Sequence, residues 1–521
     1  MNRLRTALLT AGIVLCLMPR AEAKWVWHKE KGWIEINAFP RNTEQQRYDY
    51  AIALMTDEKY ESALVEFKRL IREFAGTETA ARCAAHRVEC YCRIGAEWKA
   101  YRRAEGFFSS YPQSDMGNEV LKWEFRAGTQ LLEEGEKSGI TVLEAVLGHQ
   151  PDGPLAEQCY YEMGRYHQRE KRYDRAEQCY GTLVERFPDG RFAPKALLAA
   201  SICALRRSKK DKHGRAAAVG EAKSNLQHYS EKYAKGPEAE DAAEYIAIAQ
   251  GLETAKGKYT PRFYYALLDY MEKRYEKALK TFSKVARKKR KEDIGGDARY
   301  YEAQCLRHLD KPYKAFKALE KFFEKHPGHV KQTDAAKAEY ALCAVLKKED
   351  LKIAAWAYGQ VVKRSPYSSF ADDAQMEEGN CLYALRKYTR AQTSYEALLK
   401  AYPDSEWYGA AIFQIGMCSL ESSKFANEPG SLLKAAQARF EDYITRYPTG
   451  VKVADARAGL KRVREYQAEN AFEIAEFYVR IKRPAAAMVY LEHIKRDFGD
   501  TEWAARAEER SREIRGKGGK G

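Results

Sequence analysis

The sequence predicts an all-α protein, arranged as a solenoid of about ten or eleven helical hairpins. Three observations support this fold class. The chain has 521 residues, too many for one compact core, so several domains or a repeat array are expected. Only 16 residues are proline, fewer than an all-β chain of this length needs for its turns. A pattern of about 37–39 residues recurs along most of the chain, and self-similarity at such a period is typical of helical solenoids.

Residues 1–23 have the features of a secretory signal. Two arginines precede an apolar run from Ala7 to Met18, and residues 21–23 have the A-x-A form of a cleavage site. We therefore expect cleavage after Ala23 and an exported mature protein. Cleavage as a lipoprotein before Cys16 is the alternative, but the residues just ahead of it are not small. No second segment is long and apolar enough for a transmembrane helix, so the mature protein is expected to be soluble or peripheral to a membrane.

Residues 24–46 form a tryptophan-rich arm ahead of the repeats. Trp25, Trp27 and Trp33 lie close together and alternate with other residues as in a short strand. Tryptophan rings suit the headgroup level of a membrane surface. They equally suit a clasp that packs on the first hairpin and caps the end of the array. The first interpretation makes these three tryptophans candidate contacts with a membrane or a partner.

Residues 47–450 contain the repeats. In the repeat from Ala371 to Asp404, small and apolar residues recur at helical spacing, a turn follows at Lys387-Tyr388, and helical spacing resumes until Pro403. Proline cannot continue an α-helix, so it ends the second helix. Two such helices bury their apolar faces only by stacking on the next pair. Equivalent closing positions are occupied by Tyr111-Pro112, Phe187-Pro188, His326-Pro327, Ser365-Pro366, Tyr402-Pro403 and Tyr447-Pro448.

Three segments depart from the repeat. Residues 451–513 are predicted to form an additional helix, over 451–468, followed by a closing repeat. Residues 238–260 likewise add helical length between two repeats. The glycine- and lysine-rich residues 514–521 are predicted to be a disordered tail.

The pattern resembles the tetratricopeptide repeat. That family has small residues at positions 8 and 20 of the repeat, an aromatic residue at position 24 and proline at position 32. Counting from Asp372 places Gly379, Ala391, Tyr395 and Pro403 there. Counting from Glu157 places there Gly164, Ala176, Tyr180 and Pro188. The resemblance covers roughly residues 47–510 and implies stacked hairpins that offer an extended binding surface.

The closing repeat narrows the resemblance. It contains Ala475-Glu476-Phe477-Tyr478, then Lys482-Arg483-Pro484, Tyr490 and Trp503-Ala504. This sequence resembles the last repeat of the BamD (YfiO) family of outer-membrane β-barrel assembly proteins, which also places a long helix ahead of that repeat. The periplasmic TolA-binding proteins of the YbgF/CpoB type are the second choice, because they share the aromatic-Pro-x-Ser ending. BamD proteins usually carry a lipidated cysteine and fewer repeats, and in these respects this chain departs from the family.

The tetratricopeptide resemblance also implies a peptide-binding groove. In that family, positions 2, 5, 9 and 12 of the first helix face the groove. Four repeats supply candidates by this correspondence, namely Gln45, Tyr48, Ile52 and Met55, then Gln158, Tyr161, Arg165 and Gln168, then Asp297, Tyr300, Gln304 and Arg307, and finally Asp373, Met376, Asn380 and Tyr383. Aromatic rings bury area and amides pair with backbone groups, so this composition suits an extended peptide.

The cysteines follow the register of the repeat. Cys90, Cys203, Cys305, Cys381 and Cys418 occupy one repeat position at which the tetratricopeptide family usually has a small residue. A buried thiol fits that position, and equivalent positions in neighbouring repeats are expected to lie too far apart for a disulfide. We therefore expect mostly free, buried cysteines despite export.

The net charge of +15 indicates either anionic partners or a basic, solvated surface. The run Arg287–Lys291 could contact anionic lipid. Nucleic acid is not expected, because the chain is exported and no stacking-aromatic module accompanies the charge. No metal-ligand spacing, nucleophile elbow, phosphate loop or dinucleotide fingerprint is present. We therefore expect no enzyme, no metal and no cofactor.

These features together predict a non-catalytic protein-interaction scaffold of the cell envelope. By resemblance, its role is in outer-membrane β-barrel assembly, and its expected partners are the assembly machinery or unfolded outer-membrane proteins. The expected location is the periplasm, and peripheral contact with the outer membrane stays open as an alternative. A periplasmic adaptor for envelope integrity or cell division, of the TolA-binding type, is the alternative function.

Overall fold

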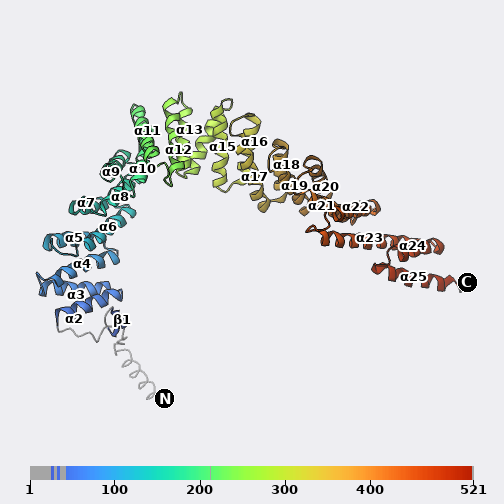
Figure 1. The fold of residues 1–521 in the computed structure, drawn as a ribbon, viewed down its shortest axis with the longest axis horizontal. Helices are drawn as coiled ribbons and strands as arrows, with labels where there is room; N and C mark the ends of the chain where they lie inside the picture. The colour runs from blue at the N-terminus through green and yellow to red at the C-terminus, as the bar shows by residue number, and fades with distance from the viewer. Residues whose placement is uncertain (1–24, 29–31, 36–42, 212, 427, 519–521) are drawn as a thin grey trace, which may run out of the picture. The chain divides into compact units, whose positions relative to one another are not determined.

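The computed structural model describes residues 25–28, 32–35, 43–211, 213–426 and 428–518, and the expected signal of residues 1–23 lies outside them. The described residues form 24 helices and one short pair of strands, so the predicted all-α fold is confirmed (Figure 1). Eleven pairs of consecutive helices are hairpins, whereas α12 and α25 are single helices. The chain divides into two compact units, Met1–Ala255 and Lys256–Gly521.

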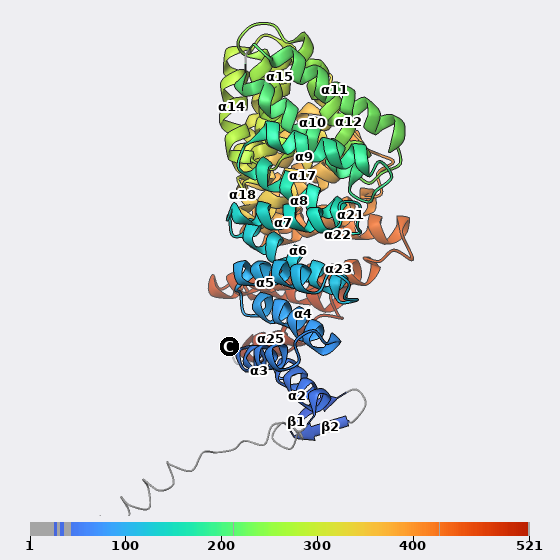
Figure 2. The same cartoon turned by 90° about the vertical axis from the view of Figure 1, so that its left-hand side faces the viewer.

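The N-terminal unit begins with a β-hairpin that contacts α2 (Figure 2). Strands β1 (Trp25–His28) and β2 (Gly32–Glu35) pair antiparallel, with Trp27 opposite Trp33. The strand-like backbone expected for the arm is therefore confirmed, while the tryptophan side chains lie outside what the structure describes. The helices of this unit are α2 (Glu44–Thr56), α3 (Tyr60–Glu73), α4 (Glu78–Arg93), α5 (Glu97–Ser110), α6 (Gly117–Glu133), α7 (Ser138–His149), α8 (Ala156–Arg169), α9 (Tyr173–Arg186), α10 (Ala193–Lys210), α11 (Arg215–Lys232) and α12 (Ala239–Thr254).

The C-terminal unit contains six hairpins and a final helix. Its helices are α13 (Thr260–Met271), α14 (Tyr275–Lys288), α15 (Asp293–His308), α16 (Pro312–Lys325), α17 (Gln332–Glu349), α18 (Leu351–Arg364), α19 (Ala371–Ala384), α20 (Tyr388–Ala401), α21 (Tyr408–Ser423), α22 (Gly430–Arg446), α23 (Val453–Arg480), α24 (Pro484–Asp497) and α25 (Glu502–Gly518). Its largest core runs from α15 to α21 and is built from small, aliphatic and aromatic side chains.

The turn inside most hairpins has one repeated geometry. One residue per turn has a left-handed backbone, and the next residue donates its N–H to a carbonyl of the last helical turn, as Lys387 does to Leu382 at 2.9 Å. This is the Schellman arrangement, which satisfies the carbonyls at a helix end. It returns the second helix antiparallel to the first. The left-handed residues are Glu58, Gly95, Gly135, Lys171, Lys273, Asp310, Arg386 and Lys482.

The contact between repeat positions 8 and 24 explains why the repeat needs a small residue at position 8. Tyr180 and Tyr395 are fully buried. A Cβ atom added to Gly164 would lie 2.5 Å from Cε1 of Tyr180, and one added to Gly379 would lie 2.4 Å from Cε1 of Tyr395. Real Cβ atoms do not approach so closely, so only glycine lets the two helices pack at this distance around the tyrosine ring.

The C-terminal helices differ from the sequence prediction in two places. The helix expected over 451–468 does not end at residue 468. Helix α23 is 28 residues long, ends at Arg480 and includes the first helix of the closing repeat. No proline interrupts this stretch, so nothing in it stops the helix. The tail expected from residue 514 is helical to Gly518. Arg510 anchors this last helix through an ion pair with Glu476 of α23 at 2.7 Å, and it also pairs with Glu513 of its own helix.

The ten cysteines of the described residues are free thiols, and eight of them are buried. The five at the shared repeat position are fully buried, as the sequence predicts. They belong to the apolar cores of the repeats; Cys381, for example, belongs to the same core as Ala391 and Tyr395. These thiols therefore act as small core residues.

Candidate functional site

The expected groove residues all lie on the first helix of a hairpin, on α2, α8, α15 and α19. First helices of successive hairpins contact one another in the N-terminal unit, where α2 meets α4, α4 meets α6 and α6 meets α8. We call the surface that these helices form together the first-helix face. It is the natural place for an extended ligand, because one ligand can contact several repeats at once.

On α2, the candidate residues mainly hold the first two hairpins together. Tyr48 is only 5% exposed, and its Oη lies 2.9 Å from Nε2 of His86 on α4. The guanidinium of Arg82 covers the Tyr48 ring at 4.8 Å, and burial raises the pKa of this tyrosine to about 12. Ile52 and Met55 are half-buried against the same core.

On α8, two of the candidates face neighbours and one faces solvent. Tyr161 is half-buried, with its ring centroid 5.0 Å from that of Phe192 at the start of α10. Gln168 accepts a hydrogen bond from the hydroxyl of Tyr180 at 3.0 Å, so its carbonyl is committed to the hairpin. Arg165 is exposed and pairs with Glu162 at 2.9 Å.

On α15, the candidates differ in exposure, and their side chains range from buried to exposed. Gln304 is 6% exposed, Tyr300 is half-buried, and Arg307 is exposed. The ammonium of Lys331 lies 5.4 Å from the Tyr300 ring. Burial raises the pKa of the Asp297 carboxyl, although the nearby His329 and Lys331 act in the opposite direction.

On α19, the candidates are mostly occupied within their own hairpin. Met376 is 5% exposed. Asn380 accepts a hydrogen bond from the hydroxyl of Tyr395 at 2.9 Å. Tyr383 is half-buried, its ring centroid lies 5.3 Å from that of Tyr388, and burial raises its pKa to about 12.

These positions correct part of the expected groove. Tyr48, Gln304 and Met376 are core residues, because the helix positions that carry them turn toward the neighbouring helices. The remaining candidates keep an exposed or half-exposed side chain, and Gln45, Arg165 and Arg307 are exposed. Sequence spacing could not tell which side of each helix the stacking covers.

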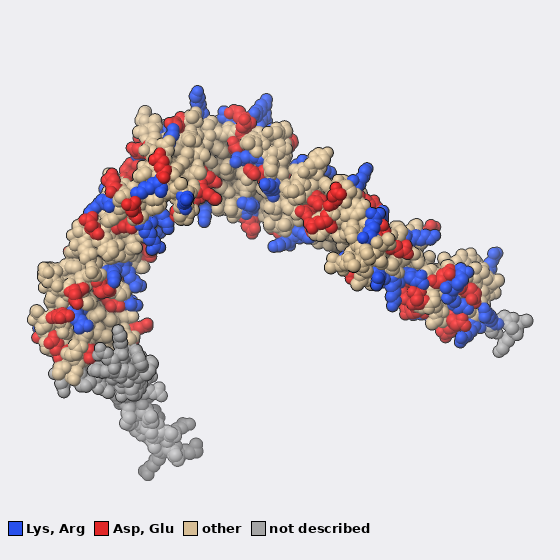
Figure 3. All heavy atoms as spheres, viewed as in Figure 1, with Lys and Arg blue, Asp and Glu red and all other residues tan. Residues whose placement is uncertain are grey.

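A second group of residues on the first-helix face escaped the sequence analysis. Two guanidinium groups contact the ring of Trp123 on α6, that of Arg93 at 5.0 Å and that of Arg126 at 5.2 Å from the ring centroid. Both arginines are exposed. Tyr161 and Arg165 lie on α8, the first helix that contacts α6. We refer to these three residues of α4 and α6, together with Tyr161 and Arg165, as the basic-aromatic surface. In Figure 3, Lys and Arg side chains gather on the side of the N-terminal unit where α6 and α8 lie.

The signal for this group was present in the sequence. The helix α6 follows the closing pair Tyr111-Pro112, and the helix after such a pair is a first helix. Trp123 and Arg126 are three residues apart and so share one face of that helix. Aromatic rings under guanidinium groups offer both apolar area and positive charge, which suits a peptide with aromatic side chains and a carboxylate.

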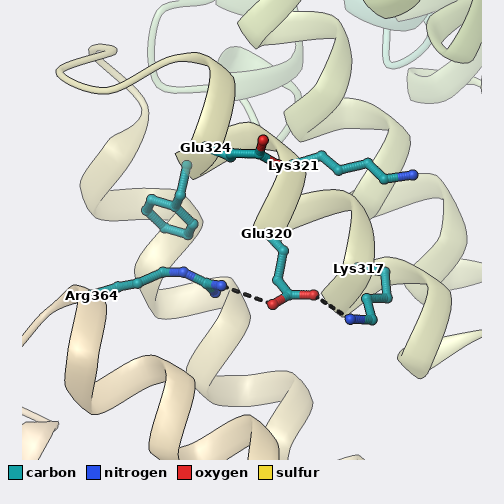
Figure 4. Close-up of a pocket in the computed structure, with 6 residues that line it drawn as sticks. Lys317, Glu320, Lys321, Glu324 and Arg364 are labelled. Carbon is teal, nitrogen blue, oxygen red and sulfur yellow. Dashed lines mark hydrogen bonds and ion pairs between the residues drawn. The ribbon is translucent and has the colours of Figure 1, made fainter.

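A hollow of about 780 Å³ lies on the second helices of the C-terminal unit, between α16 and α18 (Figure 4). Glu320 pairs there with Lys317 at 2.8 Å and with Arg364 at 2.9 Å. Arg364 also lies over the ring of Phe323 at 5.6 Å and pairs with the buried Glu339. Burial raises the pKa of Glu339 to about 8 despite this partner. Because these charges pair with one another, the hollow is less suited to a charged ligand than the basic-aromatic surface.

Parts of the chain match known families. The family described as outer membrane lipoprotein (YfiO) matches residues 335–515. The tetratricopeptide repeat family matches residues 158–190 and 297–329. A Rickettsia prowazekii (strain Madrid E) protein described as outer membrane protein assembly factor BamD is 21% identical over 157 residues, which is 30% of this chain and 62% of that protein. The match thus spans less than two thirds of the relative's length.

Solved structures of tetratricopeptide-repeat proteins are also similar. The C-terminal part of a repeat-containing protein from Cytophaga hutchinsonii is 17% identical, with a TM-score of 0.30, and the match covers 55% of this chain and 98% of that one. A tetratricopeptide repeat protein from Parabacteroides merdae is 12% identical, with a TM-score of 0.26, and the match covers 57% of this chain and 98% of that one.

The family matches and the helical hairpins agree on what kind of protein this is. The chain is a tetratricopeptide-repeat protein with a BamD-like C-terminal part, as the sequence resemblance predicts. Such an array is a protein-interaction scaffold. None of the helices in the described ranges is long and apolar enough to cross a membrane.

Proposed function

We propose that this protein is a non-catalytic scaffold of the cell envelope that binds outer-membrane β-barrel proteins or the machinery that assembles them. The observation that carries the proposal is the match of residues 335–515 to the outer membrane lipoprotein (YfiO) family. This segment spans α17 to α25, so it covers most of the C-terminal unit. The description of the Rickettsia prowazekii relative as an outer membrane protein assembly factor points to the same process.

The basic-aromatic surface is the proposed ligand site. A strand of a transmembrane β-barrel alternates apolar and polar residues and carries aromatic residues near its ends. In an unfolded barrel protein such a strand is an extended peptide. Trp123 and Tyr161 would bury its aromatic side chains, while the guanidinium groups of Arg126 and Arg165 would pair with its terminal carboxylate.

The proposed location is the periplasm, peripheral to the outer membrane. The YfiO match supports this location because the family is described as an outer membrane lipoprotein. The net charge of +15 favours contact with anionic lipid. The tryptophans of residues 24–46 are the proposed contacts of the arm with a membrane or a partner.

Peptide binding tests the proposal. We would measure the fluorescence anisotropy of a labelled synthetic peptide with the sequence of the C-terminal strand of an outer-membrane barrel protein. The mature protein should bind it and should prefer it to a scrambled peptide and to the same peptide with an amidated terminus. Trp123→Ala and Arg126→Ala should each weaken binding by about 10-fold or more, as truncation of a central contact residue does. Arg102→Ala, an exposed arginine on the second helix α5, is the matched control and should leave binding unchanged.

Two results would contradict the ligand site. Equal affinity for the strand peptide and the scrambled peptide would mean that the surface does not recognise barrel strands. Unchanged binding by the Trp123→Ala and Arg126→Ala variants would place any peptide site elsewhere on the chain. Binding of a folded or coiled-coil partner together with indifference to the strand peptide would favour the periplasmic adaptor function.

A further inference from the structure

Three side chains that commonly bind metal ions meet between α5, α6 and α7 of the N-terminal unit. They are Glu105 on α5, Glu124 on α6 and His149 at the end of α7. One ligand atom from each lies within 4.8 Å of the others. The three residues come from three helices, so no spacing in the sequence indicates this cluster.

Glu124 is the unusual member of the cluster. Its side chain is completely buried, yet neither carboxylate oxygen has a hydrogen-bond partner. No ion pair involves Glu124 among the described residues. A buried carboxylate without a donor or a cation costs several kcal/mol, so an isolated one is rarely kept in a protein interior. Burial raises the pKa of Glu124 to about 9, and the nearby Glu105 acts in the same direction, so without a cation this carboxyl group keeps a proton at neutral pH.

His149 completes the cluster. Its Nε2 lies 2.8 Å from Oε1 of Glu105, and its ring lies against the ring of Phe108, with centroids 4.0 Å apart. A contact of this kind fixes the direction of the imidazole. The exposed fractions are 42% for the Glu105 side chain and 25% for that of His149, so the cluster opens to solvent on this side.

The other titratable groups around Glu124 do not supply a positive charge. Tyr101 lies one turn before Glu105 on α5, and burial raises its pKa, with Glu105 and Glu124 acting in the same direction. Cys92 on α4 and Cys159 on α8 are thiols whose pKa burial raises to about 12, with Glu124 acting in the same direction. The carboxylates therefore face neutral groups from α4 and α8 as well as from α5.

We propose that Glu105, Glu124 and His149 form a binding site for a divalent transition metal ion such as Zn²⁺. Imidazole nitrogen and carboxylate oxygen are both zinc ligands, at distances of about 2.0–2.2 Å, and open zinc sites have three protein ligands. The opening toward solvent leaves room for a water as the fourth ligand. The ion would neutralise the two carboxylates and would join α5 of one hairpin to α6 and α7 of the next. The inclusion of an imidazole favours zinc over Mg²⁺ and Ca²⁺, which prefer oxygen ligands. The proposal does not depend on the proposed function.

Titration of the full mature protein, after treatment with a chelator, tests this site. Zn²⁺ should bind by isothermal titration calorimetry with one strong site per chain and should raise the unfolding temperature. Co²⁺ should bind the same site and give visible d–d absorption bands. Mg²⁺ and Ca²⁺ should bind far more weakly.

Variants show which residues bind the ion. His149→Ala removes a partly exposed ligand, so it should fold, and it should lower zinc affinity by more than about 100-fold, which exceeds the loss caused by changing an outer partner. Glu124→Gln keeps the shape of the buried side chain and should have the same effect. His228→Ala and Glu133→Gln change exposed residues of the same unit and are the matched controls. Circular dichroism verifies that each variant keeps its helices.

Two results would overturn the proposal. The first is the absence of a stoichiometric zinc site in the chelator-treated protein. The second is zinc binding that His149→Ala and Glu124→Gln reduce no more than the controls do, which would assign the ion to other surface groups. In either case, a Glu124→Gln variant more stable than the wild type would identify Glu124 as a buried acid that shares a proton with Glu105.

Discussion

The packing of Gly164 against Tyr180 makes a quantitative prediction for Gly164→Ala. The new Cβ would lie 2.5 Å from Cε1 of Tyr180, whereas ordinary carbon contacts are about 3.5–4.0 Å long, so the ring or the helix must move by about 1 Å. The ring has little freedom to do so, because Tyr180 is fully buried and its hydroxyl donates to Gln168 at 3.0 Å. Overpacking of this kind typically costs about 1–3 kcal/mol.

The matched control for Gly164→Ala is Gly181→Ala in the same hairpin. A Cβ at Gly181 would meet no atom within 4 Å. Both substitutions gain the helix propensity of alanine, about 1 kcal/mol, so the difference between the two variants isolates the overpacking. We expect Gly181→Ala to be more stable than the wild type and Gly164→Ala to be about 1–3 kcal/mol less stable than Gly181→Ala.

Hydrogen exchange at the amides of α8 and α9 is the suitable assay, together with urea unfolding. Repeat arrays do not unfold in a single step, so a local measurement is more informative than one global transition. Equal stabilisation by the two substitutions would refute the reasoning. It would mean that the small residue at position 8 of the repeat is not required by the tyrosine at position 24.

Two further predictions concern buried charges. In Arg364→Met, the 1% exposed Glu339 loses its cation, and because burial raises the pKa of Glu339 to about 8, the loss of stability should grow from pH 6 to pH 9 and reach about 3 kcal/mol. The control Arg446→Met breaks an exposed i,i+4 pair and should change stability little at any pH. A loss in Arg364→Met that does not vary with pH would contradict this prediction. Burial lowers the pKa of His167, so the unfolded chain takes up a proton that the folded chain resists, and stability should fall as the pH drops below about 6.5. His167→Gln should reduce the fall in melting temperature between pH 7.5 and pH 5.5, while substitution of the exposed His228 should not, and equal pH profiles would exclude a contribution from His167.

The sequence predicted the helical hairpins well because the repeat combines several signals that agree. Apolar spacing marks each helix, a closing proline ends the second helix, and the glycine and tyrosine of positions 8 and 24 meet in the structure as the register requires. The same signals fail where they are missing. Between Val453 and Arg480 no proline or turn signal occurs, and there the structure has one long helix where two were expected.

The candidate site was predicted less well because it depends on contacts between repeats. Position within a helix does not show how far the next hairpin turns over it, and stacking buries Tyr48 and Met376. The basic-aromatic surface combines α4, α6 and α8, and the cluster around Glu124 combines α5, α6 and α7. Such sites appear only when helices that are distant in sequence are placed side by side.

The most direct test of the central claim is to identify what the protein binds in its own envelope. We would attach a tag after the last residue, treat intact cells with a crosslinker, and identify the recovered proteins by mass spectrometry. The account predicts recovery of β-barrel assembly proteins or unfolded barrel chains, and a reduced yield of the barrel chains with Trp123→Ala. Recovery of periplasmic or inner-membrane partners alone would contradict a role in outer-membrane protein assembly and would leave the adaptor function.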